Sequence, residues 1–203
     1  MLRGQRAPER LQKVRSESAN GIGENRMTVT HAAVTVAGMN PLTATELQTS
    51  FINCSKREAT SIPLPDLSDL TWANLDFLAW RNARTPQRAY LVAPMPDGPV
   101  GLVFRIAAAR NAAGAMRSSM CEFCHTVHSA GGVTLFTAIK AGTRGRRGDS
   151  VGNYFCSDLS CSAYIRQLKR PRRVQPVNTL GEAERIERLR TRLSGMVANV
   201  LAG

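Results

Sequence analysis

The sequence predicts an α+β fold in which a small antiparallel sheet is flanked by N-terminal and C-terminal helices. Three observations predict it. Short β-rich runs separated by turn residues occupy the middle of the chain, a long amphipathic segment ends it, and two closely spaced cysteine pairs lie between them. At 203 residues the chain is long enough for one domain, or for two small domains that share a core.

Residues 1–38 differ in composition from the rest of the chain. Most of this segment is polar, basic and without hydrophobic periodicity, which predicts disorder. We therefore expect the folded domain to comprise residues 39–203. Residues 1–38 are expected to be a dispensable tail, or a mis-assigned start upstream of a natural start at Met39.

One helix is expected over residues 41–59, at the start of the domain. Thr43 and Glu46 have the spacing of a capping box, which marks its first turn. Helical spacing places three side chains on its apolar face: Leu47, Phe51 and Cys54. Cys54 lies far from the other cysteines, so we expect it to be a small buried hydrophobe. The next segment, residues 66–82, holds both tryptophans and is expected to be core.

The strands are expected in the middle of the chain. Two β-rich runs flank a Pro-Asp-Gly turn and predict a hairpin, and a further strand follows the first cysteine pair. A glycine-rich basic loop then leads to a short strand end. The expected ranges are 88–94 and 99–107 for the hairpin, 131–140 for the further strand, 141–152 for the loop and 153–156 for the strand end.

Two helices are expected after the strands. The first begins within residues 157–169 and is ended by Pro171. The second starts at a capping box formed by Thr179 and Glu182 and runs to the C-terminus. Its apolar face is expected to hold Leu180, Ala183, Ile186, Leu189, Leu193, Val197, Val200 and Leu201. We expect this face to pack on its own domain; docking into a groove of a partner is the alternative.

The two cysteine pairs have the spacing of a structural zinc site. Cys121-x2-Cys124 is followed, after 31 residues, by Cys156-x4-Cys161. A knuckle, a β-hairpin and a helix that carries the last ligand form the order of a treble-clef zinc finger. Four thiolates would leave no open coordination position, so the Zn²⁺ would be structural and not catalytic. The alternatives are a redox CxxC pair and four unrelated buried cysteines.

Two histidines accompany the first cysteine pair. His125 directly follows Cys124, and adjacent residues seldom bind one small ion without strain. His128 could replace a cysteine in a Cys3His site, but four cysteines already complete the ligand set. We therefore expect both histidines to lie at the surface or to support the ligands from outside.

Positive charge is concentrated in one stretch of the chain. Residues 140–173 hold nine basic and two acidic side chains, a net +7 of the chain's formal +12. Such a field attracts an acidic partner, either RNA or an acidic protein surface, although a solvated basic face would have the same composition. A zinc ion with four thiolates would lower the formal charge to +10, from the +12 of the chain.

Several functional classes are not expected from this sequence. It contains no P-loop, GxSxG or HExxH motif, so an enzyme is not expected. No apolar run approaches the roughly 18 residues of a membrane span, and no apolar segment follows the basic N-terminus as in a secretory signal. The expected compartment is the cytoplasm, where disulfides are disfavoured and cysteines are more often metal ligands.

Four stretches of the sequence resemble the FBP family, which shares the C-terminal treble-clef zinc finger of the fusidic-acid-resistance protein FusB. They are FINCSKREA, LDFLAWRN, MCEFCHTVHSAGGVTLFTAIKAG and GDSVGNYFCSDLSCSAYIR. The resemblance covers Asn40 to about Leu201. FusB also carries an N-terminal helical bundle, whereas only one helix is expected before the strands here. The bundle is expected to be absent or reduced, which leaves resistance itself open.

The resemblance implies a function in translation. FusB-like proteins dock on elongation factor G and help it leave a stalled ribosome, without hydrolysing a substrate. The implied zinc ligands are Cys121, Cys124, Cys156 and Cys161, and the implied partner contacts are Phe123, Lys140, Arg144 and Tyr154. We expect a monomer. The alternative function is a zinc finger that binds RNA, including rRNA, through its basic segment.

Overall fold

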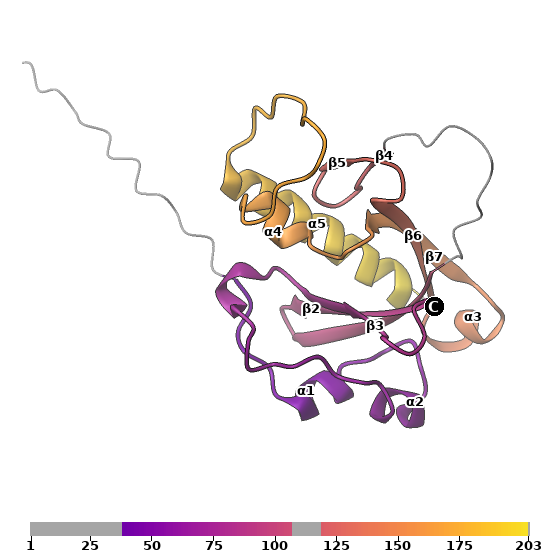
Figure 1. The fold of residues 1–203 in the computed structure, drawn as a ribbon. Coiled ribbons are helices and arrows are strands. Elements are labelled where there is room, and N and C mark those ends of the chain that lie inside the picture. The colour runs from indigo at the N-terminus through magenta and orange to yellow at the C-terminus, as the bar shows by residue number, and fades with distance from the viewer. Residues whose placement is uncertain (1–37, 107–118, 203) are drawn as a thin grey trace, which may run out of the picture. The chain divides into compact units, whose positions relative to one another are not determined.

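A five-stranded antiparallel sheet is the centre of the fold in the computed structural model (Figure 1). The structure describes residues 38–106 and 119–202, which belong to one unit, Val34–Gly203. Most of the expected tail, residues 1–37, therefore lies outside the described residues. The strands follow the order β1-β2-β3-β6-β7, with bounds β1 Leu78–Arg81, β2 Arg88–Met95, β3 Gly98–Ile106, β6 Val133–Ile139 and β7 Ser150–Cys156. The α+β prediction is confirmed.

The β2–β3 hairpin forms where the sequence predicts it. The register runs from Arg88 opposite Arg105 to Met95 opposite Gly98, so only Pro96 and Asp97 lie outside the paired positions. Gly98 has a φ of 120°, a backbone conformation that only glycine adopts without strain. The turn chemistry of Pro-Asp-Gly therefore sets the register of the two longest strands.

The β6–β7 hairpin carries a short helix where an irregular loop was expected. This helix, α3, spans Gly142–Arg146, and β7 begins at Ser150, three residues before the expected strand end. Gly145 makes the tight turn feasible, because a Cβ there would lie 1.7 Å from the Lys140 carbonyl oxygen. The prediction of a loop over residues 141–152 is thus wrong at 142–146, which are helical, and at 150–152, which belong to β7.

A two-stranded ribbon and a short helix carry or flank the cysteines. β4 (Ser119–Met120) and β5 (Val127–His128) form a two-stranded ribbon on either side of the first cysteine pair. The helix α4 spans Cys161–Ile165. It ends well before Pro171, contrary to the prediction, because Gln167 has a φ of 57° and turns the chain into the left-handed region.

Two short helices, α1 (Ala44–Thr49) and α2 (Lys56–Thr60), form where one helix was predicted over residues 41–59. The capping box is present: the Glu46 carboxylate accepts the Thr43 N–H at 2.7 Å, and the Thr43 hydroxyl accepts the Glu46 N–H at 3.2 Å. The helix stops because the chain joins the sheet. Phe51 forms a parallel bridge with Gly101 of β3, which offers the backbone an alternative to helical bonds.

The tryptophan-rich segment is core, as expected, but it also contains a strand that was not predicted. A short 3₁₀ helix, η1, spans Trp72–Asn74, and β1 pairs with β2 immediately afterwards. The Trp80 indole N–H donates to the Pro63 carbonyl at 2.8 Å. β1 was missed because it is only four residues long and its burial does not alternate cleanly.

Both faces of the sheet are covered. Figure 1 shows the C-terminal helix α5 (Glu182–Leu201) over one face and α1 and α2 beside the other. Alternate residues of β2 enter different cores: Leu91 joins the core beneath α5, and Tyr90 and Val92 join the core beneath α1 and α2. We call these the α5 core and the N-terminal core.

Helix α5 begins later than the sequence predicts. Its first residue is Glu182, preceded by Gly181, whose N–H donates to the Glu184 carboxylate at 2.7 Å. The Thr179 capping box is therefore wrong. Its buried face is Ile186, Leu189, Leu193, Met196, Val197 and Val200, while Ala183 and Leu201 are exposed. No helix in the described part of the chain is long and apolar enough to cross a membrane.

Candidate metal centre

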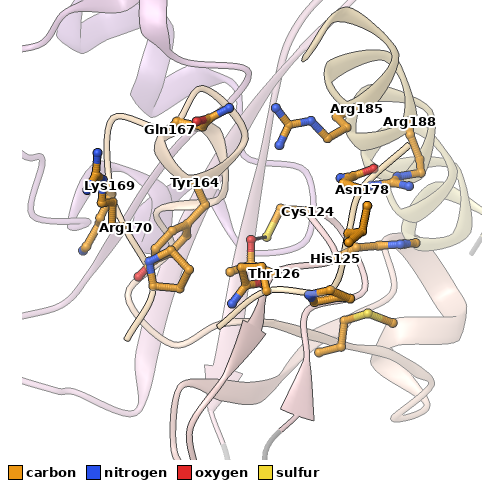
Figure 2. A pocket seen from close by; sticks show the side chains of 15 residues that line it. Cys124, His125, Thr126, Tyr164, Gln167, Lys169, Arg170, Asn178, Arg185 and Arg188 are labelled. Carbon is orange, nitrogen blue, oxygen red and sulfur yellow. Dashed lines mark hydrogen bonds between the residues drawn. The ribbon is translucent and has the colours of Figure 1, made fainter. Parts of the chain in front are cut away.

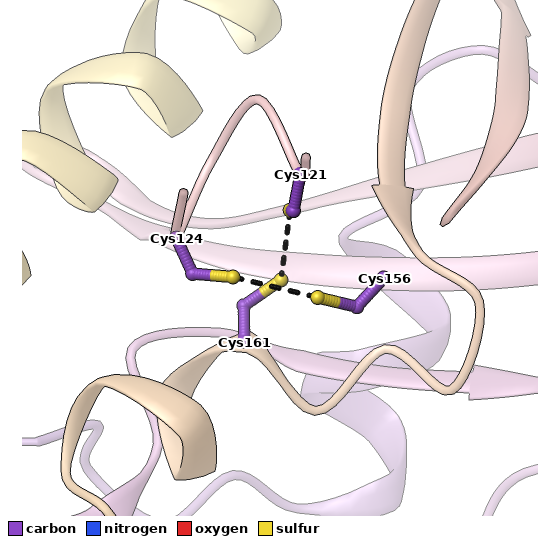
Figure 3. A group of neighbouring side chains, drawn as sticks. All are labelled: Cys121, Cys124, Cys156 and Cys161. Carbon is purple, nitrogen blue, oxygen red and sulfur yellow. Dashed lines mark hydrogen bonds between the residues drawn. The ribbon is translucent and has the colours of Figure 1, made fainter. Parts of the chain in front are cut away.

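The four expected ligand cysteines converge on one buried point. Their sulfur atoms all lie within 4.8 Å of one another (Figure 3). Cys121 Sγ is 3.7 Å from Cys161 Sγ, and Cys124 Sγ is 3.4 Å from Cys156 Sγ. Tetrahedral coordination at a Zn–S distance of about 2.3 Å requires sulfur atoms roughly 3.8 Å apart. The cluster therefore has the size of a four-thiolate zinc site, and no disulfide joins these cysteines.

Local structure explains how each pair reaches the centre. Cys121 and Cys124 flank a tight knuckle between β4 and β5, in which the His125 N–H donates to the Cys121 carbonyl at 3.0 Å. His125 adopts a φ of 58° to complete that turn. Cys156 ends β7, and Cys161 begins α4. The second pair therefore comes from a strand end and the first turn of a helix, as the sequence predicts.

The ionisation of the four cysteine thiols also favours a bound cation. Hydrogen bonds from the neighbouring thiols, those of Cys124 first, lower the pKa of the Cys121 thiol well below its usual range. The pKa values of Cys156 and Cys161 are raised, because their thiols share protons with Cys121 and are desolvated. Four sulfur atoms this close cannot all ionise alone. A divalent ion stabilises every thiolate at once, so the buried cluster fits one structural zinc ion.

Three groups hydrogen-bond to the sulfur atoms from outside the cluster. The Phe123 backbone N–H donates to Cys121 Sγ at 3.4 Å. The Thr126 hydroxyl lies 3.2 Å from Cys124 Sγ, and His128 Nε2 lies 3.2 Å from Cys156 Sγ. Such contacts orient the ligands and disperse the thiolate charge.

The two histidines take different positions. His128 is buried, with its ring edge against Tyr164 at a centroid distance of 5.0 Å. It contacts the cluster through Cys156 and is not one of the converging ligand atoms. His125 is half-buried, and burial together with the charges of Arg188 and Arg192 lowers its pKa. The expectation that both stand outside the ligand set fits this arrangement.

A buried ion network beside the cluster was not anticipated from the sequence. Asp76 is fully buried and forms ion pairs with Arg166, which follows α4, and with Arg190 of α5. The Asp76 backbone N–H donates to the Ser162 hydroxyl at 3.0 Å. This network ties the segment before β1 to both helices that cover the cluster. The signal was an aspartate within the apolar stretch LDFLAW, which requires a buried partner.

The four expected partner-contact residues lie in three different environments. Phe123 is 2% exposed and stacks on Phe155 at a centroid distance of 4.0 Å, so its ring is part of the α5 core and not a contact surface. Tyr154, on β7, is 48% exposed. Lys140 Nζ and Arg144 Nη1 lie 3.2 and 3.5 Å from the Ala202 carbonyl oxygen, at the end of α5. Cations at a helix C-terminus stabilise its unpaired carbonyls.

The basic stretch of the sequence is divided in space. Arg146 and Arg147 lie at α3, at the far end of the β6–β7 hairpin from Cys156 (Figure 1). Arg170, Arg172 and Arg173 lie on the segment between α4 and α5, which we call the strap (residues 166–180). Seven paired residues separate the hairpin ends, or roughly 20 Å of strand. Within the described residues, the two acids of the stretch already pair with Arg144 and Lys169.

Comparison with known proteins agrees with this geometry. A family model described as "FBP C-terminal treble-clef zinc-finger" matches residues 46–200. A solved structure titled "Structure of the fusidic acid resistance protein FusC" aligns with a TM-score of 0.44 at 16% identity, covering 62% of this chain and 52% of that chain. The chain thus spans about half the length of that protein. No curated protein matches it. The family match extends over most of the chain and includes all four cysteines, and the chain belongs to the FBP family of C-terminal treble-clef zinc-finger proteins.

Proposed function

We propose that this protein is a non-enzymatic binding module that docks on translation elongation factor G at the ribosome and changes the release or turnover of the factor. In this proposal a zinc ion held by Cys121, Cys124, Cys156 and Cys161 stabilises the docking domain and takes no part in chemistry. The protein acts as a monomer in the cytoplasm. The single observation that carries the proposal is the family match over residues 46–200.

The metal centre supports a binding function because it is closed. The four sulfur atoms are buried and lie within 4.8 Å of one another, so a zinc ion bound by all four would have no free position for water or a substrate. Loss of the ion would release β4, β5 and α4, which are too short to hold their positions alone. The proposed role of the metal is therefore to keep the surrounding surface in one conformation.

The surface around the finger supports an acidic protein partner. Tyr154 is a large exposed aromatic side chain on β7, of the kind that anchors protein interfaces. Its backbone is fixed to the knuckle, since the Glu122 N–H donates to the Tyr154 carbonyl and the Tyr154 N–H donates to the Glu122 carboxylate, both at 3.0 Å. Arg146 and Arg147 are exposed at α3. Electrostatic attraction from these arginines would raise the association rate.

A binding experiment with purified elongation factor G tests the proposal. We expect Tyr154→Ala to weaken binding at least tenfold, because truncation of a central aromatic anchor costs about 2 kcal/mol or more. The matched control is Val177→Ala, which truncates another exposed apolar side chain, one that is 96% exposed on the strap. No binding of the zinc-loaded protein at low salt would contradict the proposal.

The same experiment separates a protein partner from RNA. Binding to RNA phosphates would fall steeply with salt and would be weakened most by replacing the strap arginines Arg172 and Arg173. Binding to the factor should depend more on Tyr154 and on Arg146 and Arg147. Capture from lysate with and without RNase then shows whether an RNA bridge is needed. An interaction abolished by RNase and recovered with RNA alone would replace the proposed partner.

A further inference from the structure

A cavity of about 440 Å³ lies between the zinc knuckle, the strap and the first two turns of α5 (Figure 2). His125 and Thr126 line it from the knuckle, Tyr164 from α4, and Arg185 and Arg188 from α5. Its volume is within the usual range for sites that hold small ligands, about 300–1,000 Å³. The metal centre lies behind one wall, which includes Cys124, and does not use this space.

The lining of this cavity is basic and holds no carboxylate. Its charged side chains are Lys169, Arg170, Arg185 and Arg188, and no Asp or Glu is among the lining residues of the described structure. Lys169 pairs with Asp158 at 2.7 Å, outside the lining. The three arginines have no acidic partner among the lining residues. A cavity of this composition attracts an anion.

The hydrogen-bonding of the two α5 arginines gives the stronger argument. Arg185 Nε, Arg188 Nε and Arg188 Nη2 are buried, and they have no hydrogen-bond partner within residues 38–106 and 119–202. Buried guanidinium donors are almost always satisfied, because leaving one unpaired costs about 1–3 kcal/mol or more. Figure 2 shows Arg185 extending from α5 toward the side formed by Gln167 and Tyr164. Both side chains also line the cavity, where a change of rotamer would bring these N–H groups to an acceptor.

The cavity wall is fixed by a specific contact. The Gln175 side chain pairs with the backbone of Val127 in both directions: its Oε1 accepts the Val127 N–H, and its Nε2 donates to the Val127 carbonyl, each at 2.8 Å. Nε2 also donates to the Arg173 carbonyl at 2.9 Å. These bonds join the strap to β5 as an additional short strand would. The strap is thereby held against the knuckle, which preorganises the cavity.

Charge balance with the metal centre does not explain the two arginines. A zinc ion with four thiolates carries a formal charge of −2, and nearby cations would offset it. However, no hydrogen bond joins Arg185 or Arg188 to any of the four sulfur atoms, whose partners outside the cluster are Phe123, Thr126 and His128. Long-range attraction to the charge of the metal centre would not give the buried guanidinium donors a hydrogen-bond acceptor. A ligand with several acceptor oxygens would satisfy them.

We propose that this cavity binds a phosphate group, with Arg185 and Arg188 donating hydrogen bonds to its oxygens. Two guanidinium groups with unpaired donors suit phosphate, which offers more acceptor oxygens than a carboxylate and carries more charge. The group could belong to a free phosphate, a nucleotide or an RNA backbone, which share this chemistry. The proposal does not rest on binding to elongation factor G.

Titration of the zinc-loaded full chain with inorganic phosphate tests the site. The Nε–H signals of the arginines are followed by NMR at constant ionic strength, with chloride replaced by phosphate. We expect saturable shifts of the Arg185 and Arg188 signals, and at least tenfold weaker binding in Arg185→Gln and Arg188→Gln. The matched control is Arg192→Gln, which removes the same charge from α5 outside the cavity lining. Its affinity for phosphate should stay within twofold of the parent.

Two further arms make the result decisive. Arg188→Lys keeps the charge but loses the planar fork, so its affinity should fall; an unchanged affinity would overturn the proposed recognition. Zinc content confirms that each variant is folded. A mononucleotide and a short single-stranded RNA replace inorganic phosphate to identify the source of the phosphate. The absence of saturable shifts with all three probes, or equal weakening in Arg192→Gln, would overturn the proposal.

Discussion

The two faces of the sheet are covered by cores that differ in chemistry. The α5 core contains the four ligand cysteines together with Phe123, Phe136 and Phe155. The N-terminal core contains no metal ligand and is built from aliphatic side chains and the group Phe51, Trp80 and Tyr90, whose ring centroids lie 5.4 to 6.3 Å apart. One sheet therefore joins a core that contains the four-cysteine cluster to a core that contains only packed side chains.

This difference suggests that metal binding controls one half of the molecule more than the other. Around the cysteines, β4 and β5 have two residues each and α4 has five, so hydrogen bonds within these elements stabilise little. The N-terminal helices are equally short, but they pack against the two long strands β2 and β3. The region around the four cysteines also bears the exposed Tyr154 and the cavity for which we propose phosphate binding.

The largest effect is expected when the metal centre is broken. Cys156→Ser leaves three thiolates and a hydroxyl, so zinc affinity and the free energy of unfolding should both fall, the latter on the order of several kcal/mol. Both tryptophans pack against the N-terminal core, so their fluorescence reports on that core alone. We expect zinc content and melting temperature to fall while the tryptophan emission stays close to native.

Cys54→Ser is the matched control for this substitution. Cys54 packs against the N-terminal core and is not one of the four converging cysteines, so its loss should leave the zinc content unchanged. Removal of the ion from the parent protein by a chelator should reproduce the effect of Cys156→Ser. Simultaneous loss of the native tryptophan signal would show that the two cores unfold together. Unchanged zinc content and melting temperature would refute the four-thiolate assignment.

The next largest effect is expected at Asp76, where the chain passes from one core to the other. Leu75 packs against the N-terminal core and Phe77 belongs to the α5 core. Asp76→Asn removes the charge that Arg166 and Arg190 share, and breaking a buried pair in this way destabilises by about 3–5 kcal/mol. The urea concentration at the midpoint of unfolding measures the loss.

An exposed ion pair in the N-terminal region provides the comparison for Asp76. Glu58 and Arg88 form a salt bridge with side-chain exposures of 33% and 37%. Glu58→Gln should cost at most about 1 kcal/mol, because solvent screens the attraction. If Asp76→Asn and Glu58→Gln shift the urea midpoint of unfolding equally, burial does not make the Asp76 ion pairs stronger than an exposed pair.

The metal ligands and the strand pattern were predictable because they depend on short-range rules. The spacing of the cysteines predicts that they form one cluster. The Pro-Asp-Gly turn with its flanking β-rich runs predicts the register of β2 and β3. β2 is buried on both faces, so it reads as a β-rich apolar run and not as an alternating pattern. These features need no knowledge of distant parts of the chain.

The features that escaped prediction depend on tertiary contacts. The capping box gave the correct start of α1, but its end is decided by Gly101, fifty positions beyond Phe51 in the sequence. The Asp76 network and the Gln175 contact join residues 86 and 48 positions apart. The C-terminal helix was placed too early because Thr179 has the spacing of a cap, whereas Glu184 provides one at Gly181. Local signals cannot choose between competing caps or reveal such distant partners.

A smaller effect is expected from Gly101, which packs against Phe51 of the N-terminal core. A Cβ at this position would lie 2.6 Å from Ser50 Oγ and 2.8 Å from Phe51 Cδ1. Gly101→Ala should therefore displace Phe51 and destabilise by about 1–3 kcal/mol, with zinc content unchanged. Gly195→Ala is the control, because nothing lies within 4 Å of its Cβ position on α5. Gly195→Ala should stabilise the helix by roughly 0.5–1 kcal/mol. Equal destabilisation by Gly101→Ala and Gly195→Ala would show that the contact with Phe51 is not the cause.

The smallest effect is expected at Cys54, whose chemistry contrasts with that of the four ligand cysteines. Desolvation first, and then the charge of Glu58, raise the pKa of this thiol to about 11 from an ordinary value of 9.0. Because the folded protein keeps a proton that the unfolded chain releases, stability is constant below about pH 9 and falls as the pH rises toward 11. At pH 8 its thiolate fraction is roughly a hundredfold lower than that of an ordinary cysteine, so alkylation by iodoacetamide should be slow. Chelation should expose the four ligand cysteines to alkylation and leave Cys54 slow, as mass spectrometry can measure; faster labelling of Cys54 than of the ligands would show that the N-terminal core opens first.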